Sequence, residues 1–116
     1  MTYEAARSYV KKAIEKYSDK VTVEEYSEDL LVFDTENNLL LTLVGHTYGW
    51  YGVIKGLKFR DLDALYEQGI WAWNENPGDD YVWEVYDADG VTEKATKKFV
   101  KNCLFLIDYL LTDTSR

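Results

Sequence analysis

Residues 21–44 read VTVEEYSEDLLVFDTENNLLLTLV and contain three short apolar runs separated by two polar turns. In the first run, Val21 and Val23 alternate with polar residues, which is the period of a half-buried strand. Residues 27–29 and 36–38 supply the Ser, Asp and Asn that favour turns. Three successive strands with short turns between them predict an antiparallel meander.

The third run, residues 39–44, is apolar at every position except Thr42. A half-buried strand alternates polar and apolar residues, so this strand is predicted to be covered on both of its faces. Either the chain covers both faces itself, or a helix covers one face and a partner covers the other.

Amphipathic helices are predicted at both ends of the chain. Residues 2–17 repeat apolar side chains at the helical period, and Thr2 is placed to cap the first turn. The same period runs from about Thr92, a second potential N-cap, to Leu111.

The segment between the meander and the last helix is predicted to add one helix and two strands. Residues 59–68 form the helix, and residues 70–73 and 81–86 form the strands, joined by a type II turn at 76–79. The element order is then α-β-β-β-α-β-β-α. The predicted fold class is α+β, a mostly antiparallel sheet of about five strands with the N- and C-terminal helices on one face. The length of 116 residues predicts a single domain, residues 1–116.

The negative charge of the chain is concentrated in residues 61–92. The formal net charge is −8, and this segment alone carries nine Asp and Glu residues with no Lys, Arg or His. Aromatic residues are interleaved with the acids, and aromatic anchors with complementary charge are typical of protein interfaces. The sequence therefore predicts a partner-binding face. Its candidate residues are Glu75, Asp79, Asp80, Glu84, Asp87 and Asp89 for charge, with Trp73 and Tyr81 as anchors. The alternative is a solvated sheet edge whose charges oppose aggregation.

Composition excludes several classes of partner. A pI near 4.6 disfavours direct binding of nucleic acid or of anionic membranes, both of which require clustered Lys and Arg. A single cysteine, Cys103, and no signal-like or membrane-spanning segment predict a cytoplasmic protein.

Residues 45–52 combine three glycines with His46, Tyr48, Trp50 and Tyr51. One interpretation is a loop in which these four side chains line a small-ligand pocket. The other is a hairpin bent by its glycines, with the aromatic rings packed inward. The spacing matches no phosphate-binding glycine motif.

No catalytic signature, metal site or cofactor motif is found. His46 is the only histidine, the serines occur in no nucleophile motif, and Cys103 lies on the apolar stripe of the last helix. The Asp-rich turn around Asp87 lacks the ligand spacing of a calcium loop. A carboxylate pair acting as in a glycosidase stays an alternative, although the chain is short for a sugar cleft.

These patterns favour a small non-enzymatic protein that binds a basic partner and inhibits it by occlusion, and the partner class that they favour is a nucleic-acid enzyme with a positive groove. In composition alone, the chain resembles the small acidic inhibitors that phages use against host defence nucleases. One alternative is a ligand-binding or enzymatic α+β domain that uses the 45–52 loop. Another is a structural or assembly subunit that forms a homodimer through the last helix, around Leu104, Ile107 and Leu111.

Overall fold

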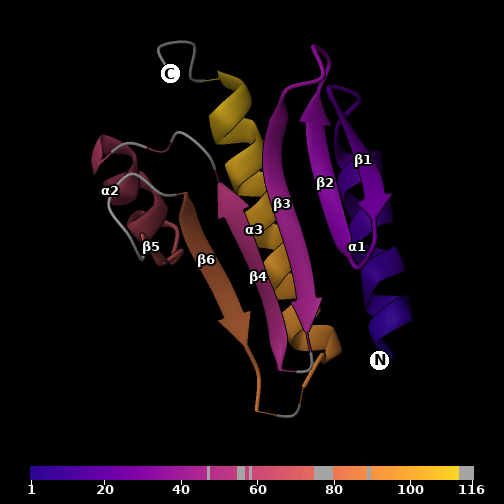
Figure 1. Cartoon of the computed structure of the whole chain (residues 1–116). Coiled ribbons are helices and arrows are strands. Elements are labelled where there is room, and N and C mark those ends of the chain that lie inside the picture. The colour runs from indigo at the N-terminus through magenta and orange to yellow at the C-terminus, as the bar shows by residue number, and fades with distance from the viewer. Residues whose placement is uncertain (47, 55–56, 58, 75–79, 89, 113–116) are drawn as a thin grey trace.

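The computed structural model describes residues 1–46, 48–54, 57, 59–74, 80–88 and 90–112. Within those ranges the chain forms an α+β fold, which confirms the predicted class (Figure 1). The helices are α1 (Tyr3–Tyr17), α2 (Phe59–Glu67) and α3 (Glu93–Thr112). The strands are β1 (Val21–Tyr26), β2 (Asp29–Asp34), β3 (Leu39–His46), β4 (Gly49–Ile54), β5 (Ala72–Trp73) and β6 (Tyr81–Tyr86).

The strands form one antiparallel sheet in the order β1-β2-β3-β4-β6-β5. The sheet has one strand more than the predicted number of about five, because the predicted element order includes no strand at residues 49–54. In the structure β4 pairs with β3 on one side and with β6 on the other. The glycines of β4 lie where neighbouring atoms come too close for a side chain. A Cβ atom at Gly49 would overlap the Val85 carbonyl, and one at Gly52 would overlap the Trp83 ring.

Both terminal helices pack on the same face of the sheet, as the sequence predicted, and Figure 1 looks onto the opposite face. The helix α1 contacts β1 and β3, and α3 contacts β4 and β6. Each of these two helices is capped by the predicted threonine, which directly precedes its first residue. The Thr2 hydroxyl accepts from the Ala5 amide, and the Thr92 hydroxyl accepts from the Ala95 amide, each at 3.1 Å. No helix within the described ranges is long and apolar enough to cross a membrane.

An aromatic stack joins α3 to the centre of the sheet. Phe99 of α3 stacks on Trp50 of β4 and on Trp83 of β6, with ring centroids 5.3 and 5.8 Å apart. All three side chains are buried, and the Trp50 indole donates to the Thr96 hydroxyl at 3.3 Å. Trp83 lies across Gly52, which is its cross-strand neighbour. The missing side chain of Gly52 therefore makes room for the indole.

We predict that Gly52→Ala lowers the free energy of unfolding by about 1–3 kcal/mol, the usual range for overpacking a core. The added methyl would overlap the benzo half of the buried Trp83 ring. Urea denaturation followed by circular dichroism measures the change. Trp83→Phe removes the overlapping atoms, so the double variant should lose less than the two single changes add up to. Simple additivity would contradict this explanation.

Candidate functional site

The face of the sheet opposite α1 and α3 carries a continuous row of side chains across all six strands. The register places one residue from each strand in this row: Glu24, Leu31, Thr42, Val53, Val82 and Trp73. Glu24 at the edge is exposed, and the other five are half-buried by their neighbours. None of the described helices packs over them, so we call this surface the open face (Figure 1).

A second row crosses the open face one pleat away. It consists of Tyr26, Asp29, Val44, Tyr51 and Glu84. Tyr26, at the edge of the sheet, is 70% exposed. The open face thus combines aliphatic side chains, exposed aromatic rings and carboxylates, which is the composition of many protein interfaces.

An aromatic cluster ends the open face at the β3–β4 hairpin. The His46 ring lies 5.7 Å from the Tyr51 ring and 5.4 Å from the Tyr86 ring, measured between centroids. Gly49 stands between His46 and Tyr86 in the register, so no side chain separates the two rings. Tyr86 remains 58% exposed, which leaves part of the cluster accessible to a partner.

Glu84 and Tyr86 lie two positions apart on β6 and therefore share the open face. The nearby Glu84 carboxylate raises the pKa of Tyr86 above its ordinary value of 10.0 by favouring the protonated phenol, with burial and the Glu84 charge adding to the shift. The interaction ties the carboxylate to the aromatic cluster.

Charge is segregated between the two layers of the molecule. None of the six strands contains a Lys or Arg residue, whereas they hold five acids: Glu24, Glu25, Asp29, Asp34 and Glu84. The helices α1 and α3 together contain eight basic and four acidic residues. The sheet layer is therefore acidic and the helical layer is basic.

The acids of the 61–92 segment lie in several different surroundings. Glu84 is on the open face, and Asp80 is half-buried just before β6. Asp87 follows β6, where its Oδ2 accepts from the Thr92 hydroxyl at 2.8 Å. Three further predicted residues lie outside the described ranges: Glu75, Asp79 and Asp89.

Asp61 of the same segment is fully buried in α2 and accepts a hydrogen bond of 2.5 Å from Tyr109 of α3. Asp63 and Glu67 are exposed on α2. The acids that the structure describes therefore occupy more than one surface, and Asp61 serves to fix α2 against α3.

The two predicted anchors point to opposite sides of the sheet. Trp73 lies on the open face, where it pairs with Val82. Tyr81 pairs with Ile54 on the helical side and packs against the core. Only Trp73 is thus placed to contact a partner on the open face.

The four aromatic residues of the 45–52 segment are also divided. Trp50 is buried in the core, and Tyr51 lies on the open face. His46 and Tyr48 line a pocket of about 730 Å³ beside the hairpin. The segment is a hairpin end, as one of the two interpretations held, and it also contributes to a cavity.

Three connections and the start of α1 surround this pocket. The β1–β2 turn contributes Glu28, the β3–β4 hairpin contributes His46 and Tyr48, and the β6–α3 connection contributes Val91. Tyr3 forms the wall at α1. Its ring stacks on Trp50, and Gly45 permits this, because a Cβ atom there would lie 2.8 Å from the Tyr3 ring.

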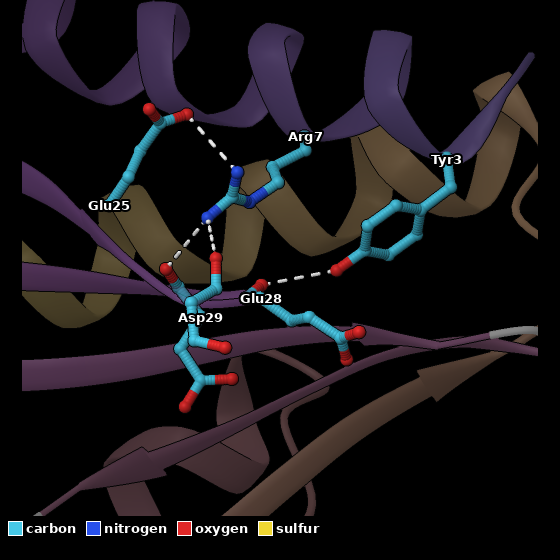
Figure 2. Close-up of polar contacts among 6 residues, drawn as sticks. Tyr3, Arg7, Glu25, Glu28 and Asp29 are labelled. Atoms are coloured by element: carbon cyan, nitrogen blue, oxygen red, sulfur yellow. Dashed lines mark hydrogen bonds and ion pairs between the residues drawn. The ribbon is translucent and has the colours of Figure 1, made fainter.

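The β1–β2 turn is held against α1 by a polar network (Figure 2). Arg7 Nη2 donates to the carbonyls of Ser27 and Asp29 at 2.7 and 3.1 Å, and Nη1 donates to Glu25 Oε1 at 3.3 Å. The Tyr3 hydroxyl donates to the Glu28 carbonyl at 3.1 Å. The network uses the backbone of Glu28 and leaves its carboxylate outside these contacts.

The surroundings of Cys103 and His46 bear on the candidate chemistries named from the sequence. Cys103 is fully buried, and desolvation raises the pKa of its thiol well above the ordinary value, so it is not a reactive nucleophile. His46 Nδ1 accepts from the Tyr48 amide at 3.4 Å. In the part of the chain that the structure describes, no three His, Cys, Asp or Glu residues are arranged to hold a metal ion.

Comparison of the chain with protein-family models, with curated proteins and with solved structures gave no match.

Sequence reasoning missed most of the open face. Leu31, Val53 and Val82 occupy the second set of alternating positions in their strands, the set that does not face the helices. The available signal was that these second positions are apolar too, as noted only for residues 39–44. Applied to β2, β4 and β6, the same observation would have indicated a sheet with two apolar faces.

We predict that Glu84→Gln lowers the pKa of Tyr86 toward its ordinary value, because the acceptor charge that stabilises the phenol is removed. A pH titration followed by the ¹³Cζ resonance of Tyr86 measures this. A raised folded-state pKa contributes stability below the ordinary tyrosine pKa, and that contribution is lost as pH rises through the raised value. Glu24→Gln removes a charge from the same face and should leave the pKa of Tyr86 in place. An equal effect of both substitutions would contradict the assigned role of Glu84.

Proposed function

We propose that this chain is a non-enzymatic binding protein that docks a basic protein partner on its open face. The observation that carries the proposal is the combination of uncovered apolar residues on four of the six strands, Leu31, Val53, Val82 and Trp73, with the absence of Lys and Arg from all six. Such a surface offers apolar area for affinity and negative charge for selection of the partner.

The apolar row supplies the contact area. Val53 and Val82 are cross-strand neighbours on β4 and β6, with Trp73 beside Val82 at the end of the row, and Leu31 of β2 lies on the other side of Thr42. Tyr51 and Tyr86 add aromatic rings next to the row. Apolar burial contributes roughly 25 cal/mol per Å² before the cost of association is subtracted. The apolar residues of the open face are spread over several strands, so a broad partner surface would bury more of them than a small ligand.

The acids of the open face favour a partner with positive charge. Glu24, Asp29 and Glu84 lie among the apolar residues of the open face, and its strands bring no cation to balance them. A basic partner would be attracted over about one Debye length, roughly 8 Å at physiological ionic strength. Association should therefore be fast and sensitive to salt.

Charge also argues against a second copy as the occupant of the open face. Two open faces brought together would oppose carboxylates to carboxylates in an apolar setting, which is unfavourable. The homodimer seam predicted on α3 is largely used within the chain. Ile107 is fully buried, and Leu104 and Leu111 pack against the core.

The partner class that fits best is a nucleic-acid-binding protein, since its substrate groove is positively charged. The chain would occlude the groove and act as an inhibitor, in the way expected from its composition. The charge segregation supports this orientation, because the acidic sheet would face the groove and the basic helices would face away.

The proposal is tested by capturing partners from a bacterial extract with the tagged protein and then measuring binding to each purified partner. We expect a basic nucleic-acid-binding protein whose affinity falls about tenfold when Glu24→Gln and Glu84→Gln are combined, equivalent to about 1.4 kcal/mol. Val53→Lys, which places a cation in the middle of the apolar row, should weaken binding further.

The matched control is Glu15→Gln with Asp19→Asn, which removes two exposed acids from α1 and the turn after it. This variant has the same net charge as the open-face variant and should bind as the wild type does. Equal losses for the two variants would show that only net charge matters. Binding that survives Val53→Lys would place the interface elsewhere.

A further inference from the structure

We propose that the pocket beside the β3–β4 hairpin binds a guanidinium or alkylammonium group, presented by an Arg or Lys side chain of the docked partner. This inference deepens the proposed function and rests on it for the source of the cation. The binding of the cation itself can be tested on the isolated protein.

The pocket has a suitable size and place. Its volume of about 730 Å³ lies within the range of small-ligand sites and accommodates an arginine side chain. His46 belongs both to the pocket lining and to the aromatic cluster of the open face. A partner seated on the open face would therefore have the pocket directly at the edge of its footprint.

The charge of the pocket lining is negative. Glu28 is the one charged residue among the described side chains that line it. Figure 2 shows the Glu28 side chain pointing away from the Arg7 guanidinium, which pairs with Glu25 instead. The same guanidinium is also bound by two backbone carbonyls. The nearest cation on α1 is thus committed elsewhere, and the Glu28 carboxylate is left to meet a cation from outside.

Aromatic rings provide the second feature of a cation site. Tyr3 and Tyr48 both line the pocket, and Tyr48 is 62% exposed at the hairpin tip. A cation over the face of a tyrosine ring is attracted by the ring quadrupole, and Arg uses this contact more often than Lys. Because Tyr3 is held by its hydrogen bond to the Glu28 backbone and by its stack on Trp50, its ring is already ordered for such a contact.

The lining disfavours the opposite class of ligand. An anion would meet the Glu28 carboxylate, and the Arg7 guanidinium does not compensate for that charge, because it is already engaged by three acceptors. Val91 and Ala88 add apolar wall, which suits the methylene stem of a basic side chain.

The experiment titrates ¹⁵N-labelled protein with N-acetyl-arginine methylamide and follows amide shifts. A second titration uses n-butylguanidinium, and n-butylurea serves as the neutral molecule of the same shape. We expect saturable shifts for both cations at Gly45, Tyr48 and Gly90, with millimolar affinity, and no saturation with the urea at equal ionic strength. Linear shifts with the cations, or equal binding of the urea, would overturn the proposal.

Glu28→Gln tests the carboxylate and should weaken cation binding at least fivefold. Its side chain makes none of the hydrogen bonds of the turn, so the fold should be kept. Glu36→Gln is the matched control. It removes an exposed acid from the β2–β3 turn, at the other end of the strands, and should bind as the wild type does. Tyr48→Leu should weaken binding as well, through loss of the ring. Wild-type affinity in Glu28→Gln would refute the assigned role.

Two comparisons identify the source of the cation and separate this inference from the proposed function. Tighter binding of N-acetyl-arginine methylamide than of free arginine supports a protein side chain, whereas the reverse order overturns that source in favour of a free metabolite. If the small cations bind but open-face variants keep partner affinity, the proposed docking face fails and the pocket stands. If the small cations do not bind while open-face variants lose affinity, the pocket fails and the docking face stands.

Discussion

The stack of Phe99 between Trp50 and Trp83 is the contact on which the arrangement of the two layers depends. It joins α3 to two adjacent strands, and it exists only because Gly52 leaves space for an indole. The Trp83 ring lies across Gly52 and fills the space that two medium-sized side chains would otherwise occupy on β4 and β6. These two strands can therefore lie close to α3. Two of the three tryptophans in the sheet, Trp50 and Trp83, are therefore used on the helical side, and none of the described helices covers the other side.

The open face is unusual because it retains apolar residues. A sheet with one solvated face normally alternates apolar and polar residues, yet β4 and β6 keep Val53 and Val82 in cross-strand register on the outer face. Exposed apolar area on a small domain is unfavourable unless something covers it. The acids on the same face lower the tendency of two copies to associate. The two features together are consistent with a surface kept for a partner of opposite charge.

Much of the fold could be predicted, because capping threonines and apolar periods are local signals. Thr2 and Thr92 mark the helix starts, and the meander follows from short polar turns. The strand β4 is missing from the predicted element order, because Gly49 and Gly52 fit a loop as well as a hairpin unless the neighbouring Trp83 ring is known. Surfaces were harder still. Proximity in sequence suggested one acidic face, whereas tertiary packing buried Asp61 and placed its neighbours on several surfaces.

The charge segregation connects the fold to the proposed binding mode. The basic residues of α3 lie in its first half, where Lys94 and Lys97 oppose the helix dipole, and the Glu93–Lys97 pair at 2.8 Å offsets this locally. The position of these lysines is explained if the proposed binding mode requires the helical layer to be basic. Such a molecule carries a dipole from sheet to helices, and the field of a basic partner would turn the open face toward it before contact. Orientation would then be set during diffusion by charge and completed on contact by the apolar row. His46 belongs both to the aromatic cluster of the open face and to the pocket lining. Contact with the partner at the open face would therefore reach the pocket at this residue.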